Sequence, residues 1–311
     1  MTSTLAPASV DAVVDVVVVA YRSADVIDRC LGAACRIHGV GQVIVVDHGD
    51  DESGAIATLA GATVLAHPDN PGFGAGQNRG FERGTSRYVL VLNPDAAPRA
   101  EGIAAGVRYL DAHPEVAIVQ GVVRDSVTSE PDRSQGRELG VLHLLGRATG
   151  ARRLARWSIA RWVAARIGAL RDHVERIPMS PTGVEALAAT AWLARRDALA
   201  NVGGFDEEYF LYGEDLDLCR RLRGAGWKIV ALPHEWAMHD QGSSAASSFE
   251  RELTWWRGTL RFAGLWWTTP QRFGALVVAF IRGAGLALQN PRAVRRIWRS
   301  TVGAALGART R

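Results

Sequence analysis

The first 120 residues contain short runs of valine, isoleucine and leucine that are apolar at nearly every position instead of alternating with polar residues. These runs lie at residues 14–19, 43–46, 63–66, 88–92 and 116–119. Strands with this pattern are buried on both faces, which is typical of a parallel sheet covered by helices. A helical pattern follows the first run, from Ser23 as the N-cap to about Arg36. The sequence therefore predicts an α/β fold with ligands bound beyond the carboxyl ends of the strands.

The arginines of the chain are gathered in two segments, although its 311 residues carry a formal charge of only +4. From Arg251 to the end there are eleven arginines and one acid, Glu252. Residues 147–176 hold eight arginines and two acids, and residues 142–170 are predicted to form a basic helical stretch with leucine and tryptophan. Such segments favour the headgroup region of anionic lipid, and the alternative is a solvated helical face packed on the main domain. No nucleic-acid-binding motif accompanies the charge.

Cysteine usage and targeting signals point to a cytoplasmic protein. The three cysteines show no CxxC spacing, so we expect small buried thiols and neither a disulfide framework nor a zinc site. The N-terminus lacks the basic region and the long apolar run of a signal peptide. The apolar run at 273–288 is interrupted by Arg282. We therefore expect a protein that lies on a membrane and does not span it.

Two polar segments follow predicted strands. Asp47 ends the second run, and Leu92-Asn93-Pro94-Asp95 closes the fourth. A carboxylate held by a rigid proline at a strand end is well placed to bind Mg²⁺, which uses one or two protein carboxylates together with phosphate oxygens. A plain turn is the alternative interpretation.

The glycine-rich segment at 71–80, which includes Gly76 and Asn78, allows a ligand to approach the backbone closely. It is not a dinucleotide fingerprint, because Arg79 stands where the third glycine should be and the segment does not follow the first strand. That mismatch argues against a nicotinamide-dependent oxidoreductase. A simple glycine-rich loop remains the alternative.

An acidic run and a late histidine complete the set of candidate residues. Glu214 and Asp215 open a predicted helix, where acids complement the helix dipole, but paired carboxylates in that position also provide a general base. His239 follows a predicted strand at 228–231. It is either structural or a second ligand in a divalent-metal site to which Asp95 contributes the first.

The order of these features is more specific than any one of them. The polar strand end at Asp47, the glycine-rich loop, Asn-Pro-Asp, the run Gly-Gly-Phe-Asp-Glu through Glu-Asp-x-Asp-Leu, and the late histidine together resemble family 2 glycosyltransferases, and within them the bacterial rhamnosyltransferase-like branch. The resemblance covers about residues 14–244. It implies a GT-A fold, with a mostly parallel sheet flanked by helices. The implied catalytic domain spans 1–245 with a basic helical insertion at about 125–182, and a helical, membrane- or acceptor-associated region follows at 246–311.

The resemblance also implies roles for individual residues that bind the donor. Tyr21 and Asp47 match positions that hold the nucleoside base and ribose, and Asn78, with Gly76 in the same loop, matches one near the ribose and diphosphate. Asn93 stands where the Asp-x-Asp motif has its first acid.

The metal and the chemistry are implied in the same way. Asp95 matches the acid that binds Mg²⁺ or Mn²⁺, and His239 matches a late metal or diphosphate ligand. Asp215 matches the catalytic base, with Glu214 beside it. In such a site the metal stabilises the leaving diphosphate while the base takes the acceptor proton, and one displacement inverts the anomeric configuration.

The expected activity is transfer of one sugar, L-rhamnose from dTDP-L-rhamnose, to a lipid-linked or cell-envelope glycan. The Gln-x-x-Arg-Trp signature of processive synthases is absent. The alternatives are transfer of another hexose or an amino sugar from a UDP or dTDP donor, and a non-catalytic peripheral membrane or polyanion-binding protein.

Overall fold

A computed structural model describes residues 13–132, 135–136, 138–148, 177–240, 247–289 and 291–298. The chain divides into two compact units. The α/β unit comprises Met1–Gly136, Arg176–Glu208 and Asp217–Ala245, and the helical unit comprises Arg137–Glu175, Tyr209–Leu216 and Ala246–Arg311. Residues 149–176 of the predicted basic insertion lie outside the described residues. The helix predicted over 142–170 is therefore described only as α5, Val141–Ala148.

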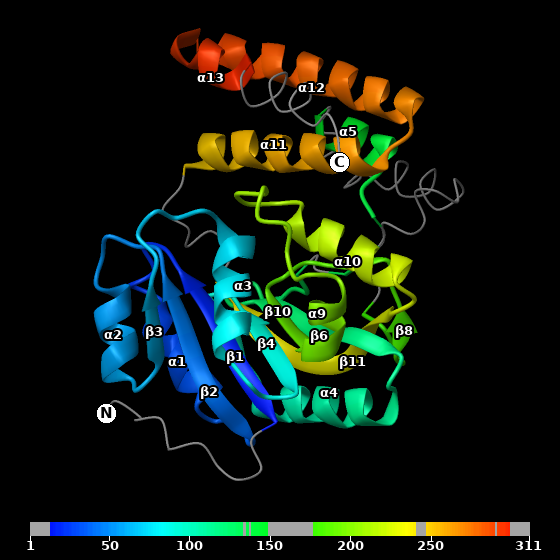
Figure 1. Ribbon diagram of the computed structural model, residues 1–311. Helices are drawn as coiled ribbons and strands as arrows, with labels where there is room; N and C mark the ends of the chain where they lie inside the picture. The colour runs from blue at the N-terminus through cyan, green and yellow to red at the C-terminus, as the bar shows by residue number, and fades with distance from the viewer. Residues whose placement is uncertain are drawn as a thin grey trace. The chain divides into compact units, whose positions relative to one another are not determined.

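Nine strands of the described residues form one sheet in the α/β unit, in the order β3-β2-β1-β4-β10-β6-β11-β5, with β8 paired to β11 (Figure 1). Their bounds are β1 Val14–Ala20, β2 Val40–Asp47, β3 Thr63–Ala66, β4 Tyr88–Leu92, β5 Ala96–Pro98, β6 Val116–Asp125, β8 Thr182–Gly183, β10 Ala191–Arg195 and β11 Lys228–His239. Strands β3, β2, β1 and β4 are parallel, as are β6 and β11, whereas β10 is antiparallel to both β4 and β6. The predicted mixed, mostly parallel sheet is confirmed.

Helices cover the sheet because alternate side chains of each buried strand point to opposite faces. Val16 and Val18 of β1 enter the main core, which also contains Leu31 of α1 and Leu110 of α4. The bounds of the helices in or entering this unit are α1 Ile27–Ala34, α2 Ser53–Leu59, α3 Phe73–Arg83, α4 Ala100–Ala112, α9 Arg196–Asn201 and α10 Glu214–Gly224. A separate two-stranded sheet pairs β7, Gln135–Gly136, with β9, Ala186–Leu187.

Helix α3 packs closely on β1 through its glycines. A Cβ atom at Gly76 would lie 2.7 Å from a methyl carbon of Val19, and one at Gly80 would overlap Val17. The glycine-rich pattern of this segment thus allows a helix to approach a strand, in addition to any role with a ligand.

The predicted N-cap at Ser23 is wrong. Helix α1 begins at Ile27, and the carbonyl of Ser23 accepts hydrogen bonds from the Val26 and Ile27 amides at 3.0 and 2.9 Å. The preceding residues form a turn instead, because the amide of Ala24 donates to Asp51 at 3.0 Å and ties this turn to the loop after β2.

The described part of the helical unit contains α5, α11 Ser248–Trp266, α12 Thr269–Gln289 and α13 Val294–Trp298, with a short 3-10 turn at Pro291–Ala293. Ser247 caps α11, accepting a hydrogen bond from the Glu250 amide at 3.2 Å. Helix α12 packs against α5 and α11. Buried side chains of these helices, among them Leu144, Trp256 and Phe262, form a core of their own. The predicted C-terminal helical extension is confirmed.

Candidate active site

Three of the predicted site residues lie at one edge of the sheet. Tyr21 follows β1, Asp47 ends β2, and Asp95 comes three residues after β4. Strands β2, β1 and β4 are parallel neighbours, with Ala20 of β1 opposite Asp47 of β2. Because the carboxyl ends of parallel strands meet at the same edge, the chain brings these side chains to a common border.

Strand pairing brings His239 to Asp95. The short strand β5 begins at Ala96, immediately after Asp95, and runs antiparallel to the end of β11 with Ala96 opposite His239. The amide of Asp240 donates to the carbonyl of Asp95 at 3.0 Å. The Nε2 atom of His239 consequently lies 3.2 Å from Oδ1 of Asp95.

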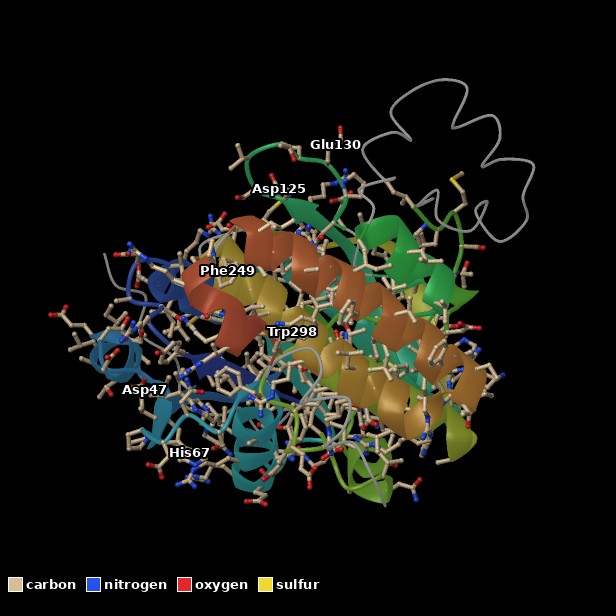
Figure 2. The ribbon with its side chains drawn as sticks, turned by 90° about the horizontal axis from the view of Figure 1, so that it is seen from above. Asp47, His67, Asp125, Glu130, Phe249 and Trp298 are labelled. Atoms are coloured by element: carbon tan, nitrogen blue, oxygen red, sulfur yellow. The ribbon has the colours of Figure 1, made fainter. Side chains whose placement is uncertain are left out.

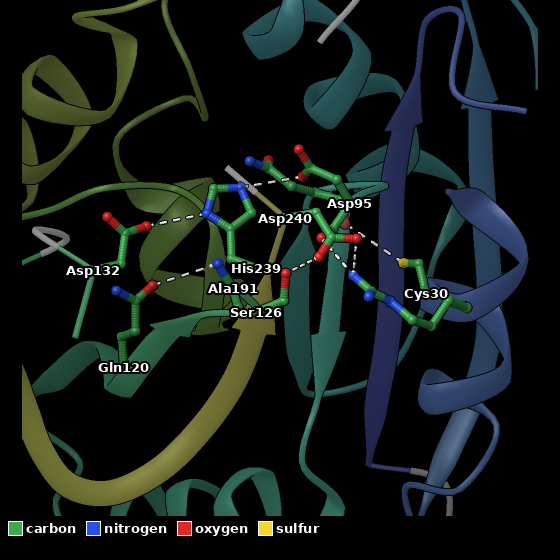
Figure 3. A network of polar contacts seen from close by, with 10 residues as sticks. Cys30, Asp95, Gln120, Ser126, Asp132, Ala191, His239 and Asp240 are labelled. Atoms are coloured by element: carbon green, nitrogen blue, oxygen red, sulfur yellow. Dashed lines mark hydrogen bonds and ion pairs between the residues drawn. The ribbon is translucent and has the colours of Figure 1, made fainter. Parts of the chain in front are cut away.

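Asp132 lies on the other side of the same imidazole (Figure 3). Its Oδ2 atom is 3.0 Å from Nδ1 of His239. The three side chains are each less than one fifth exposed. Burial alone would lower the pKa of His239, but the hydrogen bonds to Asp132 and Asp95 outweigh it and raise the pKa to about 9.

The Asp95 and His239 side chains fit a divalent metal. Neighbouring ligands of an octahedral ion with bonds of about 2.1 Å are themselves about 3 Å apart, and the two atoms here are 3.2 Å apart. A carboxylate with an imidazole suits Mn²⁺ or Mg²⁺ in a site completed by phosphate oxygens and water. Within the described residues no cluster of three or more His, Cys, Asp or Glu side chains could hold the ion.

The loops that follow β1 and β2 at this edge are joined by hydrogen bonds and an ion pair. The Arg22 guanidinium donates to both carboxylate oxygens of Asp50 at 2.9 and 2.7 Å, and the amide of Ser23 donates to the Ser53 hydroxyl at 3.0 Å. Tyr21 remains 46% exposed in this ordered turn. Asp47 accepts the Gly49 amide at 2.9 Å. An exposed aromatic ring beside a fixed carboxylate is a suitable surface for a base and a ribose.

The α3 residues predicted near the diphosphate have clear partners inside the α/β unit. The side-chain amide of Asn78 donates to the Phe205 carbonyl and to Glu207, and its oxygen accepts the Phe205 amide, at 2.9, 2.9 and 2.8 Å. A Cβ atom at Gly76 would lie 2.6 Å from Nε2 of His48. These contacts anchor α3, and the donor-binding roles of both residues stay predictions.

His48 is a buried imidazole beside this helix. It is 2% exposed, and neither ring nitrogen has a hydrogen-bond partner among the described residues. Burial, with contributions from His67 and Arg79, lowers the pKa of His48 to about 4. The ring is therefore neutral at physiological pH.

The acidic run belongs to the helical unit, where it begins α10. Tyr212 and Gly213 both have positive φ angles, 68° and 95°, directly before Glu214. Glycine tolerates this conformation, but it is uncommon for a tyrosine, so packing must hold the segment. That packing includes α11, because a Cβ atom at Gly258 would overlap the carbonyl oxygen of Tyr212.

The two acids of this run differ in burial. Glu214 is 4% exposed, and its Oε2 atom has no hydrogen-bond partner among the described residues. Burial first, and the neighbouring Asp215 second, raise the pKa of Glu214 well above its ordinary value. Asp215 is partly exposed and accepts the amide of Leu216 at 2.8 Å. Since the structure describes the two units separately, a common site for Asp215, Asp95 and His239 stays a prediction.

Sequence reasoning missed Asp132 and the pair of Arg29 with Asp240. Asp132 follows β6 by seven residues, in a loop that folds back so that the Asp132 amide donates to the Val123 carbonyl at 2.7 Å. Arg29 of α1 forms an ion pair with Asp240, next to the metal-binding candidates. The sequence gives none of these three residues a recognisable partner, so only the folded chain identifies their contacts.

The mostly parallel sheet and the polar edge beyond its strands agree with the GT-A fold that the resemblance implies, and the pair of Asp95 and His239 lies at that edge. Residues 11–258 match the family described as glycosyltransferase like family 2, and the chain belongs to that family. The resemblance seen in the sequence, including its rhamnosyltransferase-like character, is confirmed by this match and by the relatives described next.

The curated relatives include rhamnosyltransferases. An N-acetylglucosaminyl-diphospho-decaprenol L-rhamnosyltransferase of Mycobacterium tuberculosis is 28% identical over 254 residues, covering 71% of this chain and 78% of the relative. The rhamnosyltransferase WbbL of Escherichia coli is 27% identical over 169 residues, covering 54% and 58%.

Solved structures share the fold at low sequence identity. S. aureus TarS 1-349 in complex with UDP-GlcNAc matches with a TM-score of 0.55 and 15% identity, over 95% of this chain and 81% of that one. The mannosyltransferase PcManGT from Pyrobaculum calidifontis, in complex with GDP-Man and Mn2+, matches with a TM-score of 0.54 and 15% identity, over 98% and 89%.

Proposed function

We propose that this family 2 glycosyltransferase transfers one L-rhamnose from dTDP-L-rhamnose to a lipid-linked or cell-envelope glycan, with inversion at the anomeric carbon. The observation that carries the proposal is the pair of Asp95 and His239 at the carboxyl edge of the sheet, 3.2 Å apart. The names of the mycobacterial and E. coli relatives support the choice of rhamnose.

In this proposal the residues at the sheet edge hold the donor. Tyr21 stacks on the base, Asp47 binds the ribose, and Asn93 lies beside the diphosphate. Asp95 and His239 hold Mn²⁺ or Mg²⁺, which when bound supplies positive charge to the departing diphosphate. Gly76 allows α3 to approach Val19 of β1, and Asn78, which ties α3 to Phe205 and Glu207, lies near the ribose and diphosphate in this proposal.

Asp215 is the proposed general base. Its carboxylate takes the proton of the acceptor hydroxyl as that oxygen attacks the anomeric carbon from the face opposite the diphosphate, which inverts the configuration. Glu214 is proposed to support Asp215: burial, and then the neighbouring Asp215, raise the pKa of Glu214, which disfavours a second negative charge beside the base. General base catalysis of this kind is worth about 10²–10⁴-fold in rate.

The acceptor and location follow from the helical unit. We propose a cytoplasmic enzyme that works at the inner face of the cell membrane, where a lipid-linked acceptor is presented. The eleven arginines and single acid from Arg251 onward support attraction to an anionic surface.

The experiment compares donors with the purified full chain and Mn²⁺. A panel of dTDP-, UDP- and GDP-sugars is tested by thermal shift and then by transfer to an N-acetylglucosaminyl-diphospho-polyprenol. We expect dTDP-L-rhamnose to give the largest stabilisation and a single-sugar product that disappears with EDTA. A product only from a UDP- or dTDP-hexose or amino sugar would replace the rhamnose proposal, and no product or hydrolysis from any donor would contradict transfer altogether.

A further inference from the structure

Helix α12 has two apolar faces, one buried in the helical unit and one largely exposed, on which Phe280 meets the Trp298 ring of α13 with 4.9 Å between centroids. Ala275, Val278, Ala279 and Leu286 are buried in the cores of the helical unit. Apolar side chains on the opposite face are exposed, with exposed fractions of 69% for Phe273, 42% for Val277, 55% for Phe280, 62% for Ile281 and 85% for Leu288. Their spacing of three, four and seven residues places them in one stripe along the helix.

The charges around this stripe favour an anionic partner. Between Phe273 and Leu288 the only charged residue is Arg282, and it belongs to the buried face, where it pairs with Glu252 at 3.0 Å. Exposed arginines lie just beyond the two ends of the stripe, at Arg272 and Arg292. From residue 253 to the end the chain contains no acid. An apolar face bordered by arginines without acids matches a bilayer with anionic headgroups.

The packing of α12 favours a helix that lies in the plane of the membrane. By length and composition Thr269–Leu288 could cross a membrane, with a mean hydropathy of 1.3. However, its inner face packs on α5 and α11, and Figure 2 shows α12 lying along α11. A crossing helix would have to place the Arg282–Glu252 pair and its water-facing neighbours in hydrocarbon. A helix lying flat immerses only the exposed stripe.

We propose that the exposed face of α12 binds flat on an anionic lipid surface, through the apolar stripe and the arginines at its ends. The proposal deepens the proposed function and rests on it for the acceptor, since a lipid-linked acceptor lies at that surface. Binding to lipid itself is independent of sugar transfer, so the two ideas can fail separately.

The test is co-sedimentation of the full chain with vesicles of phosphatidylcholine and phosphatidylglycerol. Phe273→Glu/Ile281→Glu should weaken binding at least tenfold, and raised salt should weaken binding of the unaltered chain. The matched control is Leu59→Glu/Met179→Glu, which changes two residues of the α/β unit that are 74% and 96% exposed and should bind as before.

Three results would overturn the proposal. The first is equal binding of the Phe273/Ile281 variant and its control to the vesicles. The second is resistance of the unaltered chain to alkaline extraction from vesicles, as expected for a spanning helix. The third is that the unaltered chain forms a dimer and the variant loses this dimer but keeps its lipid binding, which would make the stripe a contact between two copies. Transfer to a short water-soluble acceptor should survive in the variant. Its absence in the unaltered chain as well would count against the proposed function and not against the lipid surface.

Asp132 carries a second inference, from a different observation. Its Oδ2 atom lies 3.0 Å from Nδ1 of His239, while Nε2 of the same ring faces Asp95. The loop that holds Asp132 is fixed by the pairing of Arg124 with Pro131, and Figure 2 shows Asp125 and Glu130 in this loop. A carboxylate that accepts a hydrogen bond from one imidazole nitrogen leaves the other nitrogen as the metal ligand and orients the ring.

We propose Asp132 as a positioning residue that orients His239 for a divalent metal. Calorimetric titration of Mn²⁺ into the full chain with dTDP measures this without turnover. Asp132→Ala should weaken Mn²⁺ binding about 10–100-fold, whereas Asp132→Asn, which keeps an acceptor oxygen, should restore most of it.

Asp125→Ala is the control, because the Asp125 carboxylate accepts hydrogen bonds from the Val127 and Thr128 amides and from the Thr128 hydroxyl, so its removal loosens the same loop and keeps the hydrogen bond between Asp132 and His239. A purely structural role for Asp132 would make the Asp125 and Asp132 alanine variants equally weak and leave Asp132→Asn without rescue. Either result would overturn the inference.

Discussion

The two groups of acidic side chains in this protein differ in what lies beside them. At the sheet edge Asp95 and Asp132 flank an imidazole, and opposite charges are matched at 3.2 and 3.0 Å. At the start of α10, Glu214 has a second carboxylate as its neighbour in the chain and is buried, and its Oε2 atom has no hydrogen-bond partner in the described part of the chain. The first arrangement suits a group that holds a cation, and the second suits a group that handles a proton.

The largest expected effect removes the proposed base. Asp215→Asn should lower sugar transfer about 10²–10⁴-fold, because the acceptor proton then has no carboxylate to receive it. Donor binding should stay unchanged, since that function is assigned to the sheet edge. Transfer rate and donor affinity are measured on the same preparation, with Glu208→Gln, an exposed acid of the α/β unit, as the control. Unchanged turnover in Asp215→Asn would remove this residue from the role.

A smaller effect should follow when the segment before α10 is displaced. In Gly258→Ala the new Cβ atom overlaps the Tyr212 carbonyl oxygen, so we expect a loss of stability of about 1–3 kcal/mol together with slower transfer. Gly285→Ala is the matched control, because a Cβ atom there meets nothing within 4 Å and alanine favours a helix interior. Denaturant unfolding measures both variants, and equal stability of the two would show that α11 does not hold this segment.

The smallest expected effect on sugar transfer concerns Glu214. Because its pKa is raised in the folded protein, its contribution to stability is present below the ordinary pKa of 4.5 and is lost as the pH rises through the folded value. The glutamine of Glu214→Gln is neutral at every pH. The variant should therefore lack the decrease of unfolding free energy with pH that Glu214 causes, which is at most about 1.4 kcal/mol per pH unit, and it should keep most of the transfer rate. Unfolding at pH 5 and pH 8, with the exposed Glu101→Gln as reference, checks this. If the variant lost stability more steeply with rising pH than the wild type, the raised pKa assigned to Glu214 would be contradicted.

The sequence predicts the parallel part of the fold well, because runs such as those of β1 and β4 are apolar on both faces and only a covered sheet buries them. It does not predict β5. Ala96–Pro98 has no strand pattern of its own and exists through its pairing with β11. The predicted start of α1 is wrong because Ser23 lies in a turn before the helix. That turn is hydrogen-bonded to the loop after β2.

The site could be predicted only where a motif marks it. Asp95 and His239 are candidates from the residues themselves, a carboxylate at a strand end and a late histidine; the resemblance gives them a metal-binding role, and strand pairing explains why they meet. Asp132 could not be found, because its place depends on a loop that returns to β6. Asn78 shows the opposite difficulty: its motif is evident, but its amide makes three hydrogen bonds to Phe205 and Glu207 that no spacing reveals.

The most direct test of the account is calorimetric titration of Mn²⁺, in the presence of dTDP, into the wild-type chain and into Asp95→Asn. The account predicts saturable binding by the wild type and an affinity lower by about 100-fold in the variant, since a charged ligand of the cation is lost. Equal Mn²⁺ affinity in the two proteins would contradict the assignment of the sheet edge as the place where metal and diphosphate are held.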